Sequence, residues 1–332
     1  MSKKYSFEKI NYLLRPKKQI ERKIFIDILN KVQNLGEVNL SNYYYIGMGS
    51  IFYYDFILFH KFLNITKMIS IDNSVLKKRF EFNRPYNFVQ FYNQTSTKFL
   101  TEFNKDSNFI LWLDYDFGIY DETKKQFKAL IEDDISLVVE KATNKDFFLI
   151  TLDIKLAKIQ NIKETNGYRK DIFYSLEQYI SLEYSKIKYI SPEYFAKVVQ
   201  SVIINIIEDK LKHKKDLNFY KLFAFGYNDG TPMLTIGGFF DESNLLQEKL
   251  SSENFINTDD TIIDIDVPIL TYREKLYLDQ KIKQHFSTGK ILKKDIKEII
   301  QDIDFDLDNM EESISSYLKY YKYYPQYYEG II

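Results

Sequence analysis

The stretch Tyr43-Tyr44-Tyr45-Ile46-Gly47-Met48-Gly49-Ser50 decides how the first half of the chain is interpreted. β-favouring residues lead into Gly-x-Gly-Ser, and an almost wholly apolar segment, 51–63, follows. A strand, a glycine turn and a buried helix in this order are typical of the ligand pocket of a doubly wound α/β domain. Glycine permits positive φ and close approach of a ligand, and the N–H groups of the next helix point toward that ligand. We therefore expect Gly47, Met48, Gly49 and Ser50 to bind a nucleotide-like cofactor.

Elements of alternating type follow this turn. Strands are expected at 43–47, 67–72, 87–92, 108–114 and 146–153, and helices at 52–63, 74–82, 96–103, 121–140, 169–182 and 192–214. Apolar strands separated by helices indicate a parallel sheet with both faces covered. Asp229-Gly230 between the β-rich runs 219–226 and 233–240 predicts an antiparallel hairpin. The expected fold is α/β, Rossmann-like and doubly wound, with a mostly parallel sheet and a terminal antiparallel hairpin.

Two segments flank this expected domain of residues 36–245. Residues 1–35 form a basic helical segment, because eight Lys or Arg and two Glu occur within 1–23, a local charge of +6. The charge indicates either a solvated helix face or a wall for an anionic substrate, for which Arg15, Lys18 and Arg22 are the candidates. Residues 246–332 are expected to form a C-terminal helical appendage with helices at 272–285, 293–303 and 308–324, and a helix-turn-helix arrangement is one candidate for it. A capping-box pattern, Thr271 to Glu274, opens the first of these helices.

Composition narrows the class of protein. The 332 residues carry a net charge of −1, so the chain as a whole does not present a positively charged surface for nucleic acid. No cysteine is present, which excludes disulfides, thiolate nucleophiles and Cys-ligated zinc, and three dispersed His give little support for a His-rich metal site. With no membrane-length apolar run and no signal-like start, we expect a cytoplasmic protein with no membrane partner. The Tyr-rich stretch 317–328 indicates packing against the main domain or, alternatively, a base-stacking platform.

Polar residues at the strand ends are the candidate ligand contacts. Asp72 closes the second strand, 23 positions after Gly49, where a carboxylate can accept both hydroxyls of a ribose. The alternative is an N-cap for the helix that begins near Ser74. Asn73 adjoins this acid, and Gln94 and Thr95 follow the third strand, where they could bind an adenine edge or cap the next helix.

Two acids close the fourth strand. Asp114 and Asp116 are two positions apart, so both side chains should emerge on one side at the carboxyl edge of the sheet. Such a pair can share a proton, act as a general base or hold a divalent cation, with Asp153 at the end of the fifth strand as a third oxygen ligand. The alternative is that both acids cap turns.

These residues resemble those of the class I S-adenosylmethionine-dependent methyltransferases over about residues 40–240. The glycine loop 46–50, the acid Asp72 and the hairpin 219–240 carry the resemblance. Asp114-Tyr115-Asp116 with Tyr120 is similar to the Asp-x-Asp-x-x-x-Tyr segment of metal-dependent O-methyltransferases, whose first Asp binds the cation. The resemblance implies S-adenosylmethionine as cofactor, Asp114, Asp116 and Tyr120 as catalytic residues, and Mg²⁺ or Mn²⁺ at Asp114 and Asp153.

A narrower resemblance joins the two ends of the chain. The chain resembles bacterial proteins described as "putative O-methyltransferases" in three short motifs: Arg15-Pro16, Glu21-Arg22-Lys23 and Thr271-Tyr272-Arg273-Glu274. The sequence also departs from the wider class: Tyr45 and Ile51 stand where an acid and a third glycine are usual. The Asp-Asn pair of the metal-dependent enzymes is Asp153-Ile154 here, and no Asn/Asp-Pro-Pro-Tyr signature of amino methyltransferases occurs.

The expected function is methyl transfer to an oxygen acceptor whose identity the sequence does not specify. One alternative is a catalytically silent, Rossmann-type cofactor- or nucleotide-binding subunit of a larger assembly, with the C-terminal helices as its protein-partner surface. Another is an RNA or DNA methyltransferase whose basic N-terminal segment and C-terminal helices contact phosphates.

Overall fold

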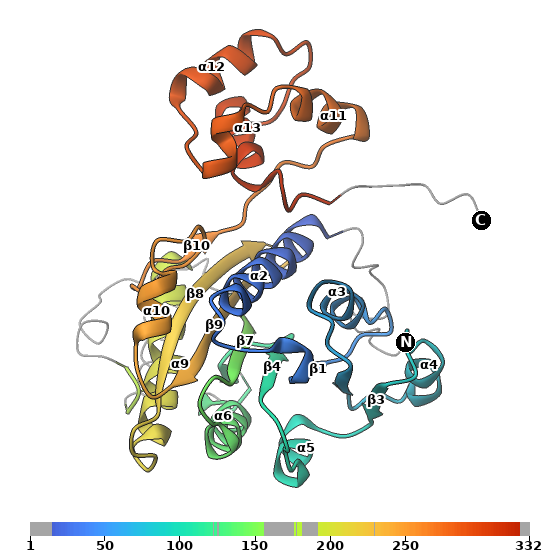
Figure 1. Cartoon of the computed structure of the whole chain (residues 1–332), viewed down its shortest axis with the longest axis vertical. Helices are drawn as coiled ribbons and strands as arrows, with labels where there is room; N and C mark the ends of the chain where they lie inside the picture. Colours follow the sequence, from blue (N-terminus) through green and yellow to red (C-terminus); the bar gives the residue numbers. More distant parts are fainter. Residues whose placement is uncertain are drawn as a thin grey trace.

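An eight-stranded sheet organises the computed structural model, which describes residues 15–121, 123–124, 126–155, 176, 178–180, 192–228 and 230–325 (Figure 1). Its strand order is β3-β2-β1-β4-β7-β9-β8-β10. The strands are β1 (Tyr44–Met48), β2 (Lys67–Ile71), β3 (Val89–Tyr92), β4 (Phe109–Asp114), β7 (Phe147–Asp153), β8 (Asn218–Asn228), β9 (Pro232–Asp241) and β10 (Ile263–Asp264). Only β9 runs antiparallel to its described neighbours. The predicted doubly wound sheet with an antiparallel hairpin is therefore confirmed.

Helices cover both faces of the sheet. One face packs against α2 (Pro16–Asn34), α3 (Tyr54–Leu63), α4 (Lys77–Phe82) and α10 (Leu245–Leu250). The other packs against α5 (Ser96–Glu102), α6 (Ala129–Lys141) and α9 (Pro192–Leu211). Side chains alternate along each strand, so Trp112 of β4 belongs to the first core and Leu111 to the second. Continuous apolar strands are therefore needed, because both sides of the sheet are buried.

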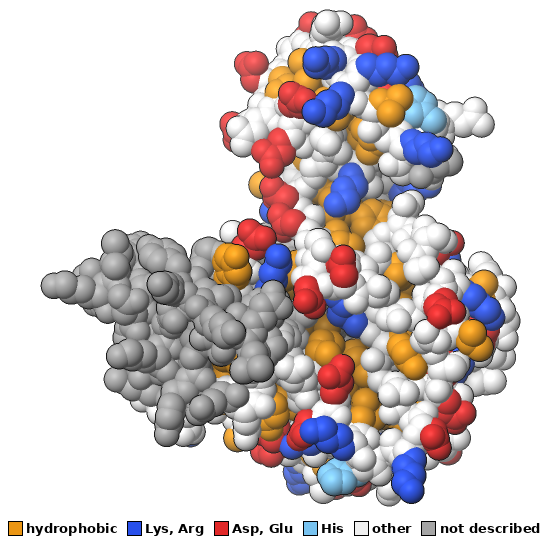
Figure 2. Space-filling model, turned by 90° about the vertical axis from the view of Figure 1, so that its left-hand side faces the viewer, with side chains coloured by type: hydrophobic (Ala, Val, Ile, Leu, Met, Phe, Trp, Pro, Cys, Tyr) orange, Lys and Arg blue, Asp and Glu red, His pale blue; other side chains and the backbone are white. Residues whose placement is uncertain are grey.

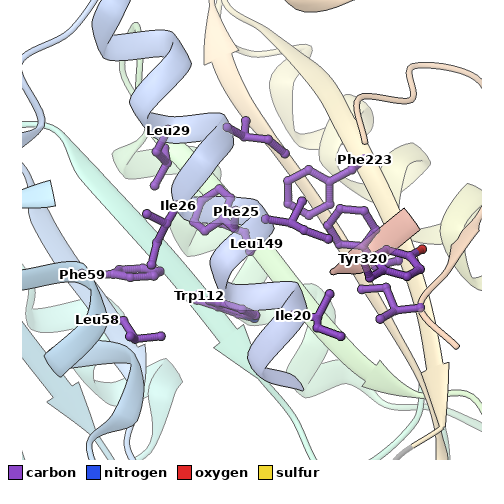
Figure 3. Close-up of a cluster of buried hydrophobic side chains, with 14 of the residues drawn as sticks. Ile20, Phe25, Ile26, Leu29, Leu58, Phe59, Trp112, Leu149, Phe223 and Tyr320 are labelled. Atoms are coloured by element: carbon purple, nitrogen blue, oxygen red, sulfur yellow. The ribbon is translucent and has the colours of Figure 1, made fainter. Parts of the chain in front are cut away.

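Helix α2 lies across the first face of the sheet (Figures 1 and 3). Its buried side chains recur at helical spacing, and Ile20, Phe25 and Leu29 are fully buried. The Phe25 ring meets the rings of Trp112 and Phe223 edge-on, with centroids 6.0 Å and 5.8 Å away. The helix begins at Pro16, a residue favoured in the first turn. This packing holds the start of α2 at one edge of the sheet.

The C-terminal residues form a separate helical layer above the sheet (Figures 1 and 2). It contains α11 (Tyr272–Gln280), the 3₁₀ helix η3 (Gln284–Thr288), α12 (Lys293–Gln301) and α13 (Met310–Tyr320). The predicted capping box at Thr271 and Glu274 is confirmed. Tyr317, Tyr320 and Tyr324 are at most 3% exposed. Tyr320 Oη donates to the Asp264 carbonyl of β10, which agrees with packing against the main domain, whereas Tyr317 Oη donates to Asp279 of α11. Tyr327 and Tyr328 lie outside the described residues.

This layer is joined to α2 by polar contacts. Lys23 Nζ donates to the Tyr323 carbonyl at 3.1 Å, and Tyr323 Oη donates to Asp27 Oδ2 at 3.0 Å. The segment boundaries predicted at 35 and 245 stay predictions, but α2 shares one hydrophobic core with the sheet and the C-terminal helices. No helix within the described part of the chain is long and apolar enough to cross a membrane.

Several elements differ from those expected. The helix expected at 121–140 begins at Ala129, because the hairpin β5 (Tyr120–Asp121) and β6 (Gln126–Phe127) precedes it. The helix expected at 272–285 ends at Gln280. The short elements α10 and β10 were not predicted, since six and two residues are too few for a periodic pattern. Most of the expected helix 169–182 lies outside the described residues, as do residues 1–14 of the N-terminal helix.

Candidate active site

A cleft of about 700 Å³ opens at the carboxyl ends of the central strands. The chain runs outward from β1 to β2 and β3 and then returns to β4 on the other side of β1. Loops after β1 and β4 therefore leave the sheet in opposite directions, which creates the crevice where open α/β sheets bind ligands. The lining residues are Arg15, Lys18, Met48, Gly49, Ile71, Asp72, Asn73, Ser74, Val75, Gln94, Thr95, Ser96, Asp114, Tyr115, Asp116, Phe117, Leu130, Thr231 and Met233.

Six of the eight predicted cofactor residues line this cleft. They are Met48, Gly49, Asp72, Asn73, Gln94 and Thr95. Gly47 is buried within β1, and Ser50 lines a separate small hollow beside α3. Sequence reasoning missed Thr231 and Met233, which the β8–β9 turn brings to the same edge. The predicted antiparallel hairpin could have indicated them, because a strand antiparallel to β7 begins beside the carboxyl end of β7, at the edge where the cleft lies.

The glycines of the opening stretch serve close packing. Positive φ occurs at three of the described glycines, Gly36, Gly230 and Gly289, so Gly47 and Gly49 do not use the freedom that glycine permits. A Cβ on Gly49 would lie 2.1 Å from Ser70 Oγ, and one on Gly47 would lie 2.7 Å from Tyr45 Oη. Side chains of the sheet itself thus require glycine at both positions.

Asp72 is a half-buried carboxylate at the end of β2. Burial and, to a smaller extent, the nearby charge of Asp116 raise its pKa to about 7, and a hydrogen bond from the Ser74 N–H opposes the shift. Helix α4 has Leu76 as its N-cap, so the alternative role of Asp72 as that cap is wrong. Thr95 does cap α5, because its side chain accepts from the Lys98 N–H at 3.3 Å.

Asp114 and Asp116 both line the cleft, as the alternation of side chains predicts, but their surroundings differ. Asp114 Oδ2 accepts from Arg22 Nη2 at 3.3 Å and lies 3.6 Å from Lys18 Nζ. Asp116 is exposed, and no hydrogen bond or ion pair to it is found among the described residues. The first acid is therefore held by cations, while the second is available to a ligand.

Arg22 forms the centre of a buried ionic network. It is 1% exposed, donates to Asp55, Asp114 and Glu21, and places its guanidinium 4.8 Å from the Trp112 ring centroid. Burial raises the pKa of Glu21 to about 7, although the Arg22 charge opposes the shift. Arg22 does not line the cleft, and it ties α2 to α3 and β4. This placement supports a structural role for Arg22, and the substrate contact stays a prediction.

The alternative interpretation of the basic residues as a solvated helix face is wrong for Lys18 and Arg22. Lys18 is 6% exposed and Arg22 is 1% exposed. Positions four apart share one helix face, and on α2 this face meets the sheet edge. Arg15 and Lys18 reach the cleft from the first turn, whereas Arg22 lies one turn deeper.

A second hollow, of about 380 Å³, adjoins the cleft through Asp116 and Phe117. Tyr120 and Asp153 line it, so the structure places them beside the cleft and not within it. Asp153 Oδ2 accepts from Thr231 Oγ1 at 2.9 Å, and its Oδ1 accepts from the Lys155 N–H at 2.6 Å.

The predicted pair of metal ligands does not converge on one point. Asp114 lines the cleft and Asp153 lines the second hollow. Lys18 and Arg22 already compensate Asp114, and no group of three His, Cys, Asp or Glu that could hold a metal ion occurs within the described ranges. Divalent cations prefer several oxygen ligands in one shell. These residues do not fit Mg²⁺ or Mn²⁺.

The fold and cleft define an α/β protein with a candidate ligand site at its switch point. A family model described as "Putative O-methyltransferase" matches residues 10–332. The match spans nearly the entire chain, so the protein belongs to this family. No curated protein sequence matches the chain.

Solved structures with a similar course of the chain include several methyltransferases. The N-methyltransferase NodS from Bradyrhizobium japonicum WM9 is 8% identical, with 67% of this chain and 97% of that chain covered and a TM-score of 0.35. Trm1 from Pyrococcus horikoshii, in complex with S-adenosyl-L-methionine, is 11% identical, with coverages of 92% and 76% and a TM-score of 0.44. An O-methyltransferase family protein from Burkholderia thailandensis is 10% identical, with coverages of 67% and 60% and a TM-score of 0.32. At this level of similarity, none identifies a substrate for this chain.

Proposed function

We propose that the protein is an S-adenosylmethionine-dependent methyltransferase that acts on an oxygen acceptor. The observation that carries this proposal is the cleft at the switch point, where Asp72, Gln94 and Asp116 meet beside the end of β1. Membership of the O-methyltransferase family agrees with it. The volume of about 700 Å³ lies within the usual range for sites that bury a drug-sized ligand.

The adenosine half of the cofactor fits the side of the cleft formed by β2 and β3. The Asp72 carboxylate can accept both ribose hydroxyls, and the Gln94 side-chain amide can reach the edge of the base. Ile71, Val75 and Leu130 supply apolar contacts for the purine faces. When bound, S-adenosylmethionine supplies an electrophilic methyl group on sulfur.

Asp116 is the residue we assign to proton transfer. An oxygen acceptor loses its hydroxyl proton as the O–CH₃ bond forms, and a carboxylate beside it can take that proton. Asp114, for which the same role was predicted, is occupied by Arg22. Most of the acceleration then comes from holding the acceptor oxygen in line with the methyl group.

Calorimetry with S-adenosylhomocysteine tests cofactor binding. Asp72→Asn removes the charge from a pair of hydrogen bonds, each worth about 1.5–3 kcal/mol, so affinity should fall at least about tenfold. Asp106→Asn is the matched control, since Asp106 is an exposed acid beside Lys67 and not part of the cleft. Unchanged affinity in Asp72→Asn would remove the ribose assignment, and no binding by the parent protein would remove the proposal.

Transfer of labelled methyl groups to a cell extract tests turnover and acceptor class. With an oxygen acceptor from the extract, Asp116→Asn should lower turnover about 10²–10⁴-fold while binding of S-adenosylhomocysteine is retained. Label recovered in RNA or DNA, with salt-sensitive binding, would favour the nucleic-acid alternative. Cofactor binding without transfer to any fraction would favour a catalytically silent subunit.

A further inference from the structure

The C-terminal layer carries a group of exposed lysines at and just before the start of α12. These residues, called the lysine surface below, are Lys290, Lys293, Lys294 and Lys297. The three that belong to α12 lie on its solvent side, opposite the buried Ile296 and Ile299. Figure 1 places α12 at the end of this layer that is remote from the sheet. The lysine surface is therefore open to a partner.

Acidic side chains near the lysine surface are engaged elsewhere. Asp295 is 1% exposed and accepts from Lys283 Nζ at 2.8 Å, so the acid within this segment is turned inward. Glu298, on the exposed side of α12, pairs with the same ammonium at 2.5 Å. In the part of the chain that the structure describes, the four lysines form no ion pair of their own. A local charge of +4 thus faces outward, although the whole chain carries −1.

The positions of these lysines are unfavourable for the helix itself. The amino end of an α-helix carries a partial positive charge, where acidic residues are favoured and basic residues are not. Lys293 and Lys294 are nevertheless the first two residues of α12. The lysines repel one another and the helix end, so a bound polyanion would relieve both repulsions. This combination favours a binding surface for a polyanion.

We infer that the lysine surface binds the phosphate backbone of duplex DNA. Lys293 and Lys297 are four positions apart, which is about 6 Å along the helix axis. Duplex DNA carries one phosphate charge per about 1.7 Å of its axis, and therefore about three or four over this length. An extended peptide advances about 3.3 Å per residue, so even a run of consecutive acids would supply about two. The charge density of the lysine surface matches the duplex better than an acidic peptide.

The composition of this segment also argues against other polyanions. Proteins bind single-stranded nucleic acid by stacking its bases on aromatic side chains, and residues 290–301 contain no aromatic residue. An anionic membrane favours helices whose outer face carries several large apolar side chains. In 290–301 the exposed large apolar side chain is Leu292, at the N-cap position.

The shape of the surface favours DNA over RNA and phosphate contacts over base readout. The major groove of B-DNA admits an α-helix, whereas the major groove of duplex RNA is deep and narrow. The connection between α11 and α12, residues 281–292, is longer than the turn of about 3–4 residues in a helix-turn-helix motif. We therefore expect binding that does not depend on base sequence.

This inference is independent of the proposed function. None of the four lysines lines the cleft, so DNA binding and methyl transfer concern separate parts of the molecule. Binding of S-adenosylhomocysteine should be the same whether the lysines are present or replaced.

Fluorescence anisotropy with a labelled DNA duplex of arbitrary sequence tests the inference. Four neutralised phosphates predict an affinity loss of about 150-fold between about 50 and 200 mM salt. Replacing Lys293, Lys294 and Lys297 together by Gln, which has a similar helix propensity, should weaken binding at low salt and reduce this loss to about threefold. Replacement of the same three residues by Arg keeps the charge and should retain both affinity and salt dependence.

The matched control changes the net charge equally at a distance from α12. It replaces three exposed lysines of the main domain by Gln: Lys61, Lys98 and Lys212. This variant should bind the duplex as the parent does. An equal loss in the control, an unaffected α12 variant, or no binding by the parent at low salt would overturn the inference.

Two competitors and one independent assay complete the test. Stronger binding of the parent to polyglutamate or to anionic phospholipid vesicles than to the duplex would overturn DNA as the partner, and so would a preference for duplex RNA. Calorimetry with S-adenosylhomocysteine reports on the proposed function separately. Failure of cofactor binding would remove that function and leave the DNA-binding result unchanged.

Discussion

Replacing Arg22 by Met should destabilise the protein by about 3–5 kcal/mol, the cost of leaving buried partners without their counter-charge. The guanidinium is 1% exposed and contacts the carboxylates of Glu21, Asp55 and Asp114. Methionine fills a similar volume, so the loss reports charge and hydrogen bonding more than packing. Urea unfolding followed by circular dichroism gives the free energy of unfolding for both proteins.

Lys17→Met is the internal control on the same helix. The Lys17–Asp266 ion pair is partly solvated, with side chains 21% and 65% exposed, and its loss should cost no more than about 1 kcal/mol. A loss below about 1 kcal/mol in Arg22→Met, equal to that of the control, would refute the idea that the network stabilises α2 on the sheet.

The same variant should show a defined dependence on pH. The raised pKa of Glu21, about 7 in the parent, means that the folded state binds more protons than the unfolded state above pH 4.5. Stability from this group is thus lost as pH rises toward 7. Removing the Arg22 charge raises the Glu21 pKa further and extends the loss to higher pH. Arg22→Met should therefore be more destabilising near pH 8.5 than near pH 6, and an equal loss at both pH values would contradict this account.

Three further predictions concern other parts of the molecule. Affinity for S-adenosylhomocysteine should rise with pH through about 7, because the raised pKa of Asp72 leaves part of it protonated below that value, and Asp72→Asn should flatten the profile. Gly49→Ala should lower the melting temperature, because its Cβ would lie 2.1 Å from Ser70 Oγ, and adding Ser70→Ala should restore much of it; no rescue would contradict a clash with the Ser70 hydroxyl. Tyr317→Phe should cost about 1.5–3 kcal/mol in urea unfolding by removing the 2.5 Å hydrogen bond to Asp279, and a change near zero would show that water replaces it.

Local patterns predicted most of the fold, because burial on both faces makes strands that are apolar runs of recognisable length. The positions of Asp72, Gln94 and Asp116 at one cleft followed from strand alternation and from the shared carboxyl edge. Whether they bind cofactor or acceptor stays a prediction.

Other features depend on tertiary contacts that no spacing rule encodes. Arg22 and Asp114 are 92 positions apart in sequence, and their pairing follows from how α2 crosses the sheet. For this reason the basic segment at the start of the chain was interpreted as a solvated helix face or as a wall for an anionic substrate. Arg22 of this segment is instead buried and connects α2 to α3 and β4. Metal ligation at Asp114 was likewise inferred from a motif without knowledge of the cations that already surround it.

The path of α2 also has a consequence for biosynthesis. Phe25 packs against Phe223 of β8, about 200 residues later in the chain. At about 5–20 residues per second, the ribosome needs at least about ten seconds to deliver that partner after α2 emerges. During this interval the apolar face of the helix lacks its final covering, and such surfaces favour aggregation. Phe223 therefore becomes available only when translation is two-thirds finished, and Tyr320, which belongs to the same core, is added later still.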